Sequence, residues 1–280
     1  MKIKRERRIT REDFVRNYLE SKEPVIVEEV YDLESLKVFS PESLIDLFGE
    51  YELQIYNELF NLQTIQSIGE YIQENFNDSN NQRTNYLRGY TQFKDVDFFW
   101  ADELFTALKD KWKQPEFLPV NNLLVPFSGP GDELCASDHN FPYKGLFISG
   151  KGAQTKLHRD PLMSNAVLCQ FYGQKKITLY SPAQEKALKA TGLLANPDNV
   201  NGDNIDFQNV IPDYTDVLNP GEIVLFPEGW YHQVESVSDS ISVTWNFVLN
   251  SDNERFSRFL QHQASSEELE VYDFFKPKQI

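Results

Sequence analysis

The chain has 280 residues, of which 40% are hydrophobic and 14% aromatic, and this fits one large domain or one core with elaborations. Such apolar content can fill a core and argues against wholesale disorder. The formal net charge of −16 argues against a large nucleic-acid footprint, which would need clustered Lys and Arg.

A short basic run, Lys2 to Arg8, is the exception to this acidity, and it is either a solvated N-terminal tail or a binding arm. The two cysteines, Cys135 and Cys169, form no CxxC pair, so they indicate neither a disulfide framework nor a zinc knuckle. The N-terminus has no apolar signal segment, and no apolar run approaches the roughly 20 residues that span a bilayer. We expect a cytoplasmic protein with no nucleic-acid or membrane partner.

The first 115 residues mix helix and strand signals. Thr10 is typical of a helix N-cap, and Ser40-Pro41-Glu42 places a cap before a proline at the first helical position. The pattern predicts further helices over 64–76 and 101–112. Between them, Tyr86 to Thr91 is typical of a strand.

From about residue 117 the pattern changes to short strands separated by Gly, Pro, Asn and Asp, which favours a sandwich or a small barrel. The Asn/Asp-rich stretch 192–213 predicts a long surface loop, and 253–275 predicts one or two helices. The predicted strands are 120–127, 145–149, 154–160, 165–172, 175–181, 222–226, 231–237 and 239–249.

Two histidines and one aspartate form a candidate metal site. His158 and Asp160 are two positions apart on a predicted strand, so their side chains project to the same face. With His232 from another strand they can bind one face of Fe(II) and leave the opposite face open for substrate and O₂. His139 and His262 have no carboxylate two residues away on a strand, and we interpret both as structural or solvent-exposed.

Lys175 shares a strand face with Ile177 and Leu179, which is unusual for an ammonium group. Either it points into a barrel and pairs with a dicarboxylate, or it lies at the strand end and reaches water. The predicted strand 239–249 has one apolar face and one mostly polar face. The polar face either lines a cavity or is half-exposed.

Four blocks of the chain resemble the JmjC/cupin-like 2-oxoglutarate oxygenases, which include asparaginyl and lysyl protein hydroxylases. The resemblance is specific within 145–250 and thinner upstream, where Tyr86-Leu87 resembles a strand that reaches the co-substrate. The four blocks are Thr155-Lys156-Leu157-His158-Arg159-Asp160-Pro161, Gly173 to Pro182, Gly221 to Val234 and Ser240 to Phe247.

The resemblance implies a mainly β fold with a double-stranded β-helix (jelly-roll/cupin) core at 116–250. An N-terminal α/β elaboration at 1–115 and C-terminal helices at 251–280 complete a single domain over 1–280. The C-terminal helices either mediate a homodimer, as in some relatives, or pack on the chain's own barrel.

For the metal and co-substrate, the resemblance implies Fe(II) bound by His158, Asp160 and His232. It implies that Lys175 pairs with the distal carboxylate of 2-oxoglutarate and that Thr155 assists it. O₂ is the second co-substrate.

The resemblance also implies that Tyr86 assists at the distal carboxylate, and that Asn165 and Asn246 lie near the metal and the proximal carboxylate. Thr155 stands an odd number of positions before His158. If both point inward, the strand must bulge or bend between them.

The function that the resemblance implies is a 2-oxoglutarate-dependent hydroxylase, acting on a protein or peptide side chain. An acidic surface would favour a basic polypeptide through electrostatic steering. The alternatives are a hydroxylase of a small molecule or free amino acid, a non-catalytic interaction module, and a metal-dependent cupin of another class. The sequence does not separate hydroxylation from demethylation.

Overall fold

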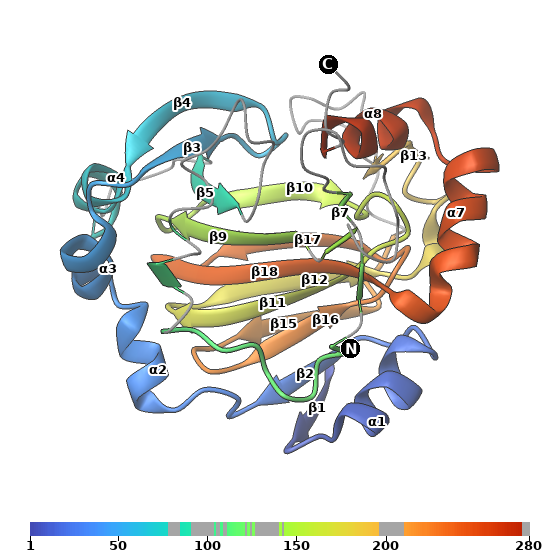
Figure 1. The fold of residues 1–280 in the computed structure, drawn as a ribbon, viewed down its shortest axis with the longest axis horizontal. Coiled ribbons are helices and arrows are strands. Elements are labelled where there is room, and N and C mark those ends of the chain that lie inside the picture. Colours follow the sequence, from blue (N-terminus) through green and yellow to red (C-terminus); the bar gives the residue numbers. More distant parts are fainter. Residues whose placement is uncertain are drawn as a thin grey trace.

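Two facing, mostly antiparallel β-sheets form the centre of the molecule in the computed structural model, and helices lie at both ends of the larger sheet (Figure 1). Within the described part of the chain, no helix is both long and apolar enough to cross a bilayer. The structure describes residues 1–77, 85–90, 104, 107–108, 111–120, 122–123, 125–126, 140–141, 143–195 and 210–275.

The core strands pass back and forth between the two sheets, which is the arrangement of a double-stranded β-helix. The larger sheet has the central order β16-β11-β18-β9, and the smaller sheet has the order β10-β17-β12-β15. The predicted mainly β fold class is confirmed. The core strands are β9 (Tyr143–Ser149), β10 (Gln154–His158), β11 (Asn165–Tyr172), β12 (Lys175–Tyr180), β15 (Tyr214–Leu218), β16 (Ile223–Phe226), β17 (Tyr231–Ser236) and β18 (Ser240–Leu249).

Strands from the N-terminal part extend the larger sheet at both edges, with β1 and β2 beside β16, and β5, β3 and β4 beside β9. The predicted elaboration therefore shares a sheet with the core, and a boundary at residue 115 stays a prediction. The remaining strands are β1 (Lys4–Arg7), β2 (Val25–Glu28), β3 (Glu52–Tyr56), β4 (Leu62–Ser67), β5 (Tyr86–Tyr90), β6 (Asn122–Leu123), β7 (Val125–Pro126), β8 (Asn140–Phe141), β13 (Ala190–Thr191) and β14 (Leu194–Ala195).

Side-chain caps set the starts of several helices, and the predicted starts after Thr10 and Ser40 are confirmed, because both side chains accept a backbone N–H of the first turn. The predicted helix 101–112 falls largely outside the described residues. The helical segments are α1 (Arg11–Phe14), a π-helical turn (Val15–Leu19), α2 (Leu33–Val38), α3 (Pro41–Phe48), α4 (Ile68–Asn75), 3₁₀ turns (Pro182–Gln184 and Asn250–Asp252), α7 (Asn253–His262) and α8 (Ser266–Phe275).

Alternation along β18 separates an outer from an inner packing region. Trp245 and Phe247 face outward and join the hydrophobic cluster that packs the larger sheet against the N-terminal helices. On the other face, Asn246 pairs with Ala166, which belongs to the cluster between the two sheets. Asn246 also lines a pocket, so the polar face of this strand lines a cavity.

The predicted helix over 64–76 is partly wrong, because β4 occupies its first part and α4 begins only at Ile68. Ser67 and Glu70 form a reciprocal capping box, which defines the helix start. Before it, the β-branched Thr64 and Ile65 favour the strand that pairs with β3.

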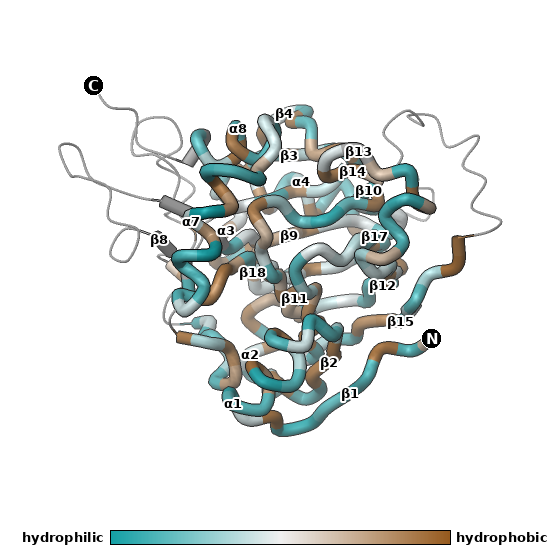
Figure 2. The backbone as a smooth tube through the Cα atoms, turned by 90° about the vertical axis from the view of Figure 1, so that its right-hand side faces the viewer, coloured by the Kyte–Doolittle hydropathy of each residue, from teal (hydrophilic) through white to brown (hydrophobic). Residues whose placement is uncertain are grey.

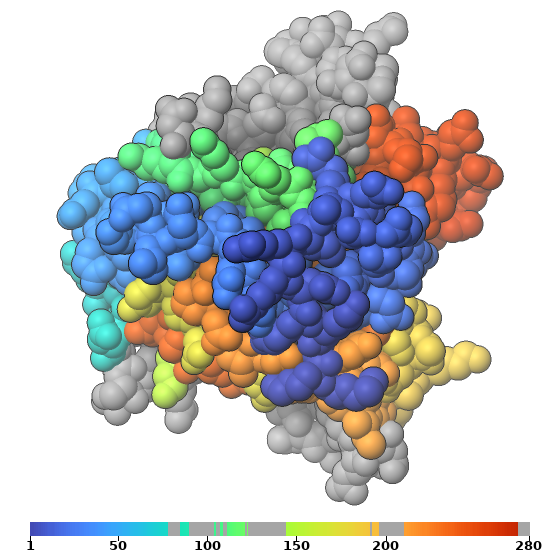
Figure 3. Space-filling view, turned by 90° about the horizontal axis from the view of Figure 1, so that it is seen from below, coloured from blue at the N-terminus to red at the C-terminus, as the bar shows by residue number. Residues whose placement is uncertain are grey.

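The basic run is neither a solvated tail nor a free arm, and this interpretation is corrected. Residues Lys4–Arg7 form β1, a largely hydrophilic strand that pairs with β2 in parallel at the rim of the larger sheet (Figure 2). Nη1 of Arg5 lies 2.6 Å from Oε1 of Glu222, and Nη2 of Arg5 lies 3.3 Å from Oδ1 of Asp216. Figure 3 shows the dark-blue N-terminal residues against the orange segment that contains β16. Acidic partners that are distant in sequence therefore fix this run.

The C-terminal helices pack their apolar side on their own chain. Phe256 and Phe259 of α7 form a cluster with Leu162 and Val248 of the core. This is the second of the two alternatives from the sequence, and the homodimer stays a prediction. The predicted loop 192–213 begins with β14, which pairs with β10, and 196–209 lie outside the described residues.

The Arg5 contacts predict a stability difference between neighbouring arginines. Arg5→Ala should lower the free energy of unfolding by about 1–3 kcal/mol, because it removes the cation shared by two nearly buried carboxylates. Arg7→Ala should cost less than about 1 kcal/mol, because the Arg7 side chain is 65% exposed. Urea unfolding of both variants measures this, and equal costs would contradict it.

Candidate metal centre

His158, Asp160 and His232 converge between the two sheets. His158 ends β10 and lies opposite His232 at the start of β17, because the two residues are register partners. Nε2 of His158 is 3.9 Å from Oδ1 of Asp160, and Nε2 of His232 is 3.8 Å from Oδ2 of Asp160. One ligand atom from each residue lies within 4.8 Å of the other two, a spacing that one metal ion can bridge.

Each imidazole is oriented by its second nitrogen. Nδ1 of His158 lies 2.7 Å from the carbonyl oxygen of Lys156, and Nδ1 of His232 lies 3.2 Å from that of Trp230. A carbonyl oxygen only accepts, so Nδ1 must carry the proton in both contacts. Nε2 of each ring then keeps its lone pair for a metal.

Aromatic rings enclose the two histidines. Phe226 stacks on His232 with ring centroids 4.5 Å apart, and Phe60 meets His158 edge-on at 4.8 Å. Burial, and then the neighbouring His232, lower the pKa of His158 to about 4. The imidazole of His158 is therefore neutral at pH 7, which is the form that binds a metal cation.

Lys175 is a buried cation on the inner face of the smaller sheet. It pairs with Ser236, while Leu179 on the same face pairs with His232. Lys175 is 6% exposed, and in the described part of the chain no hydrogen bond or ion pair joins it to a partner. Burial lowers the pKa of Lys175 to about 8. The strand-end alternative does not fit this burial, and an anion is the partner that such a site lacks.

Two inward-facing hydroxyls of the larger sheet also lack an acceptor. Tyr86 on β5 and Ser242 on β18 are buried, and neither hydroxyl has a hydrogen-bond partner among the described residues. Burial raises the pKa of Tyr86, so its hydroxyl stays a donor. Buried donors without acceptors, together with the Lys175 ammonium, fit a carboxylate ligand between the sheets.

The expected bulge in β10 is present. The register shifts between Thr155, which pairs with Val234, and His158, which pairs with His232. Three residue steps on β10 thus face two on β17, so both side chains can point inward. The backbone N–H of Val234 donates to Oγ1 of Thr155 at 3.3 Å, and this leaves the hydroxyl hydrogen of Thr155 available to a ligand.

The two asparagines lie on different faces of the larger sheet, and the roles expected of them near the metal and the proximal carboxylate stay predictions. Asn246 lines the pocket beside the triad, and its Nδ2 lies 3.4 Å from Oγ of Ser164. Asn165 starts β11 one position before the inward-facing Ala166, so its side chain lies on the other face. Its Oδ1 instead accepts the backbone N–H of Glu228 at 3.1 Å. Ser164 takes the pocket position expected for Asn165.

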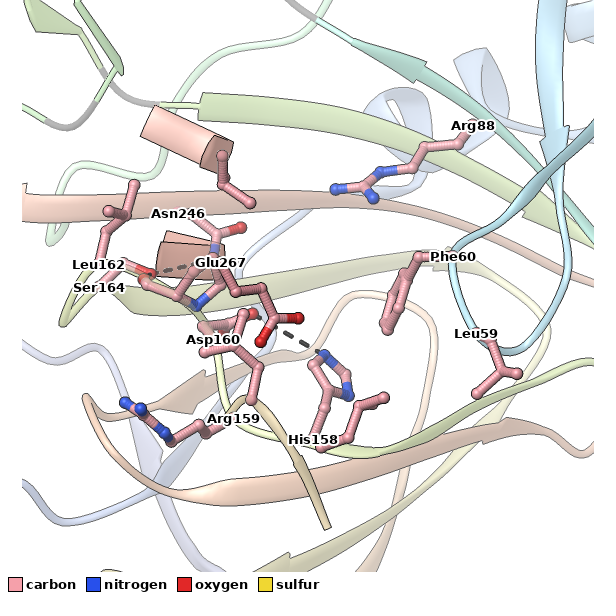
Figure 4. Close-up of a pocket in the computed structure, with 14 residues that line it drawn as sticks. Leu59, Phe60, Arg88, His158, Arg159, Asp160, Leu162, Ser164, Asn246 and Glu267 are labelled. Atoms are coloured by element: carbon pink, nitrogen blue, oxygen red, sulfur yellow. Dashed lines mark hydrogen bonds and ion pairs between the residues drawn. The ribbon is translucent and has the colours of Figure 1, made fainter. Parts of the chain in front are cut away.

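A pocket of about 290 Å³ opens beside His158 and Asp160 (Figure 4). Arg88 of β5 and Glu267 of α8 point into it from different sides, and Phe60 stands beside His158. Its lining is mixed, with both charges and apolar side chains within reach of the metal ligands. The lining residues are Leu59, Phe60, Arg88, His158, Arg159, Asp160, Pro161, Leu162, Ser164, Leu193, Leu194, Asn246, Glu267 and Val271.

Comparison with known proteins agrees with the fold. The cupin-like domain family matches residues 11–253, which is most of the chain. This chain belongs to the cupin-like domain family. The match includes β2, β3, β4 and β5, which extend the larger sheet, but not β1, and it ends at the first residue of α7.

Proteins that are similar to this chain are named as oxygenases, as demethylases or as JmjC domain-containing proteins. The 2-oxoglutarate and iron-dependent oxygenase JMJD4 of Gallus gallus is 32% identical over 154 residues, 52% of this chain and 35% of that protein. JmjC domain-containing protein A of Dictyostelium discoideum is 24% identical over 252 residues, 81% of this chain and 88% of that protein. The arginine-specific demethylase JMJ20 of Arabidopsis thaliana is 23% identical over 264 residues, which are 84% of this chain and 54% of that protein. The chain spans about a third to a half of the JMJD4 relatives.

The sequence patterns did not indicate Arg88, Phe60 and Glu267 as residues of the pocket. Arg88 stands two positions after Tyr86 on β5, so strand alternation could have placed it on the same inward face. Phe60 comes from the β3–β4 turn and Glu267 from α8, and both reach the pocket through tertiary packing. No local sequence pattern predicts such contacts. His262 is exposed, as one interpretation expected, while His139 lies outside the described residues.

The triad predicts a metal site that depends on Asp160. The wild-type cupin-like domain should bind one Co(II) or Mn(II) ion per chain, and Asp160→Ala should weaken binding by more than about 100-fold, since even outer-shell partners are worth 10–100-fold. Calorimetric titration measures this. Asp46→Ala, on the exposed side of α3, is the control and should bind like wild type. Equal binding by all three proteins would contradict the site.

Lys175 predicts opposite effects on stability and ligand binding. Lys175→Met should raise the free energy of unfolding of the ligand-free protein by about 1–3 kcal/mol, because it removes a buried cation for which the described residues supply no counter-charge. The same change should abolish the rise in Tm that 2-oxoglutarate gives to the metal-loaded wild type.

Lys176→Met is the matched control for this prediction, because Lys176 lies on the opposite face of β12 and meets Glu235 at 3.5 Å. It should leave both the stability and the response to 2-oxoglutarate near wild type. Thermal unfolding with and without 2-oxoglutarate measures both effects. A Lys175→Met protein that still responds to 2-oxoglutarate would show that the anchor lies elsewhere.

Proposed function

We propose that this chain is an Fe(II)- and 2-oxoglutarate-dependent oxygenase that oxidises a side chain of a polypeptide. The observation that carries the proposal is the combination of a His-Asp-His triad with a buried lysine on the same inner face of the barrel, which no hydrogen bond or ion pair joins to another of the described residues. The first group fits a metal with open positions, and the second fits a dicarboxylate. The JMJD4 relatives are named for these two cofactors.

When bound, iron and 2-oxoglutarate supply the oxidising chemistry, in which O₂ and 2-oxoglutarate give succinate, CO₂ and one oxygen atom in the product. The protein binds and orients. His158 and His232 offer Nε2 atoms that their backbone contacts have fixed, and Asp160 neutralises part of the metal charge. Lys175 and the hydroxyls of Tyr86 and Thr155 would hold the distal carboxylate of 2-oxoglutarate.

The walls of the pocket govern water and access. Phe226 and Phe60 cover the two imidazoles, so water reaches the metal ligands chiefly from the pocket side. A volume of about 290 Å³ suits one side chain entering between α8 and the β3–β4 turn, which both line the pocket. Side-chain oxidation needs this arrangement, with the reacting carbon held beside the metal and the rest of the substrate outside.

A polypeptide substrate is favoured by three observations. The relatives from Arabidopsis thaliana are named arginine-specific and lysine-specific demethylases. The net charge of −16 draws basic chains toward the protein. Glu267 also places a carboxylate at the pocket wall. We therefore propose a basic peptide segment as the substrate, oxidised by hydroxylation or, where a methyl group is attacked, by demethylation.

The proposal predicts slow succinate formation from 2-oxoglutarate with Fe(II) and O₂ alone, and none with Asp160→Ala. Lysine- and arginine-rich peptides should raise turnover by about 10-fold or more over acidic peptides of equal length, and the difference should shrink as salt is added. Succinate assays with mass spectrometry of the peptides measure the rate and the product.

The product separates the remaining possibilities. A peptide that gains one oxygen atom identifies a hydroxylase, and one that loses a methyl group identifies a demethylase. Oxidation of free amino acids with no peptide product would replace the polypeptide by a small-molecule substrate. Failure of the wild type to bind any divalent metal would contradict oxygenase function and favour a non-catalytic module.

A further inference from the structure

Helix α8 begins with a capping box whose glutamate is buried. The backbone N–H of Glu268 donates to Oγ of Ser265 at 3.1 Å, and Oε2 of Glu268 accepts the N–H and the hydroxyl of Ser265, both at 3.1 Å. The box that opens α4 has the same contacts between Ser67 and Glu70, but Glu70 is exposed. Glu268 is 1% exposed. Capping a helix does not require that burial, which is costly for a carboxylate without further partners.

The second oxygen of Glu268 has partners outside the helix. Oε1 accepts the backbone N–H of Leu162 at 3.2 Å, and Nη1 of Arg159 lies 3.7 Å away. These two residues flank the metal ligand Asp160 in the sequence. One carboxylate therefore joins the first turn of α8 to both sides of the loop that carries Asp160.

The backbone of this loop is strained, so contacts with neighbouring elements must stabilise it. Leu162 and Met163 have φ values of 63° and 51°, a region that costs a non-glycine residue about 1–2 kcal/mol. The side chain of Leu162 is buried against Phe256 and Phe259 of α7. The backbone N–H of Leu162 is satisfied by Glu268. Without that acceptor, a buried donor would lose its partner at a strained position two residues from Asp160.

We infer that Glu268 is a positioning residue for the metal centre, which holds the Asp160 loop against α8 so that the carboxylate of Asp160 faces the two histidines. The inference rests on the proposed metal site. It makes the C-terminal helix part of the metal centre, although α8 contributes no ligand. Both carboxylate oxygens of Glu268 accept hydrogen bonds, Oε1 from Leu162 and Oε2 from Ser265. A glutamine has only one oxygen, so its side chain cannot accept at both positions.

The test is a Co(II) titration of the full chain, because the visible absorption of bound Co(II) reports its coordination as well as its affinity. Glu268→Gln keeps the side-chain size but turns an NH₂ group toward one set of donors. We expect the dissociation constant for Co(II) to rise about 10–100-fold, as for other residues that orient metal ligands, and the absorption bands to shift.

Two controls separate positioning from helix stability. Glu70→Gln makes the same change in the capping box of α4, away from the pocket, and should leave Co(II) binding unchanged. Ser265→Ala removes the hydroxyl cap of α8 but keeps the contacts of Oε1, so it should lower Tm with Co(II) affinity near wild type. Wild-type affinity and spectrum in Glu268→Gln would overturn the inference. So would an equal loss of affinity in Ser265→Ala, which would mean that only the helix matters.

The wild-type protein provides a test that does not depend on any variant folding. If Glu268 couples α8 to Asp160, Co(II) binding should slow amide hydrogen exchange in the first turn of α8 as well as at the ligands. Protection at 158–160 and 232 without protection at 265–269 would overturn the inference while leaving the metal site intact. A wild type that binds no Co(II) would instead overturn the proposed function itself.

Discussion

The metal centre depends on one strand register, the antiparallel pairing of β10 with β17. His158 and His232 are neighbours only because they are register partners, and a slip of one residue would turn one of them away from the barrel. The bulge after Thr155 takes up the extra residue on β10. The backbone N–H of Lys156, inside this bulge, donates to the carbonyl oxygen of Glu58 in the β3–β4 turn at 3.0 Å. The N-terminal part of the chain thus holds the irregular strand that the triad needs.

Buried polar groups on the inner face of the barrel lower the stability of the ligand-free protein, and apolar packing on the outer face raises it. Lys175, Tyr86 and Ser242 are buried polar groups that lack partners within the described residues, and each lowers the stability of the ligand-free protein. On the outside of the same larger sheet, Trp245 and Phe247 pack against the N-terminal helices in the largest apolar cluster. Strand alternation lets β18 serve both roles, because successive side chains point to opposite faces.

Local patterns predicted the features that repeat with a strand period, and missed those set by tertiary contacts. The bounds of β11 were predicted as 165–172 and are confirmed, since an apolar run between turn residues is a local signal. Strand alternation places His158 and Asp160 on one face, and the structure brings both side chains together with that of His232. By contrast, β15 was missed, and the basic run was misread because two of its acidic partners, Glu222 and Asp216, lie more than 200 residues away.

The position of Asn165 shows that prediction from family resemblance can fail by a single residue. Family resemblance assigns a role to a residue by its position, and a difference of one residue in a strand moves the side chain to the other face. Asn165 consequently holds the backbone of Glu228, while its neighbour Ser164 faces the pocket. Burial of Glu268 was equally invisible, because a capping-box glutamate looks the same in sequence whether it is exposed or covered.

Carboxylates brace both loops that present metal ligands, and the two braces differ physically. Glu228, in the turn before His232, binds Arg255 of α7 and Lys22, both at 2.7 Å. Burial favours its neutral form, but these cations prevail and lower the pKa of Glu228, so this brace is intact at neutral pH and fails as acid protonates the carboxylate. Its cations are half-exposed, so salt weakens it. Glu268 relies mainly on neutral donors in a buried place, which salt screens little. The Asp160 side of the metal centre should therefore hold its geometry under ionic conditions that loosen the His232 side.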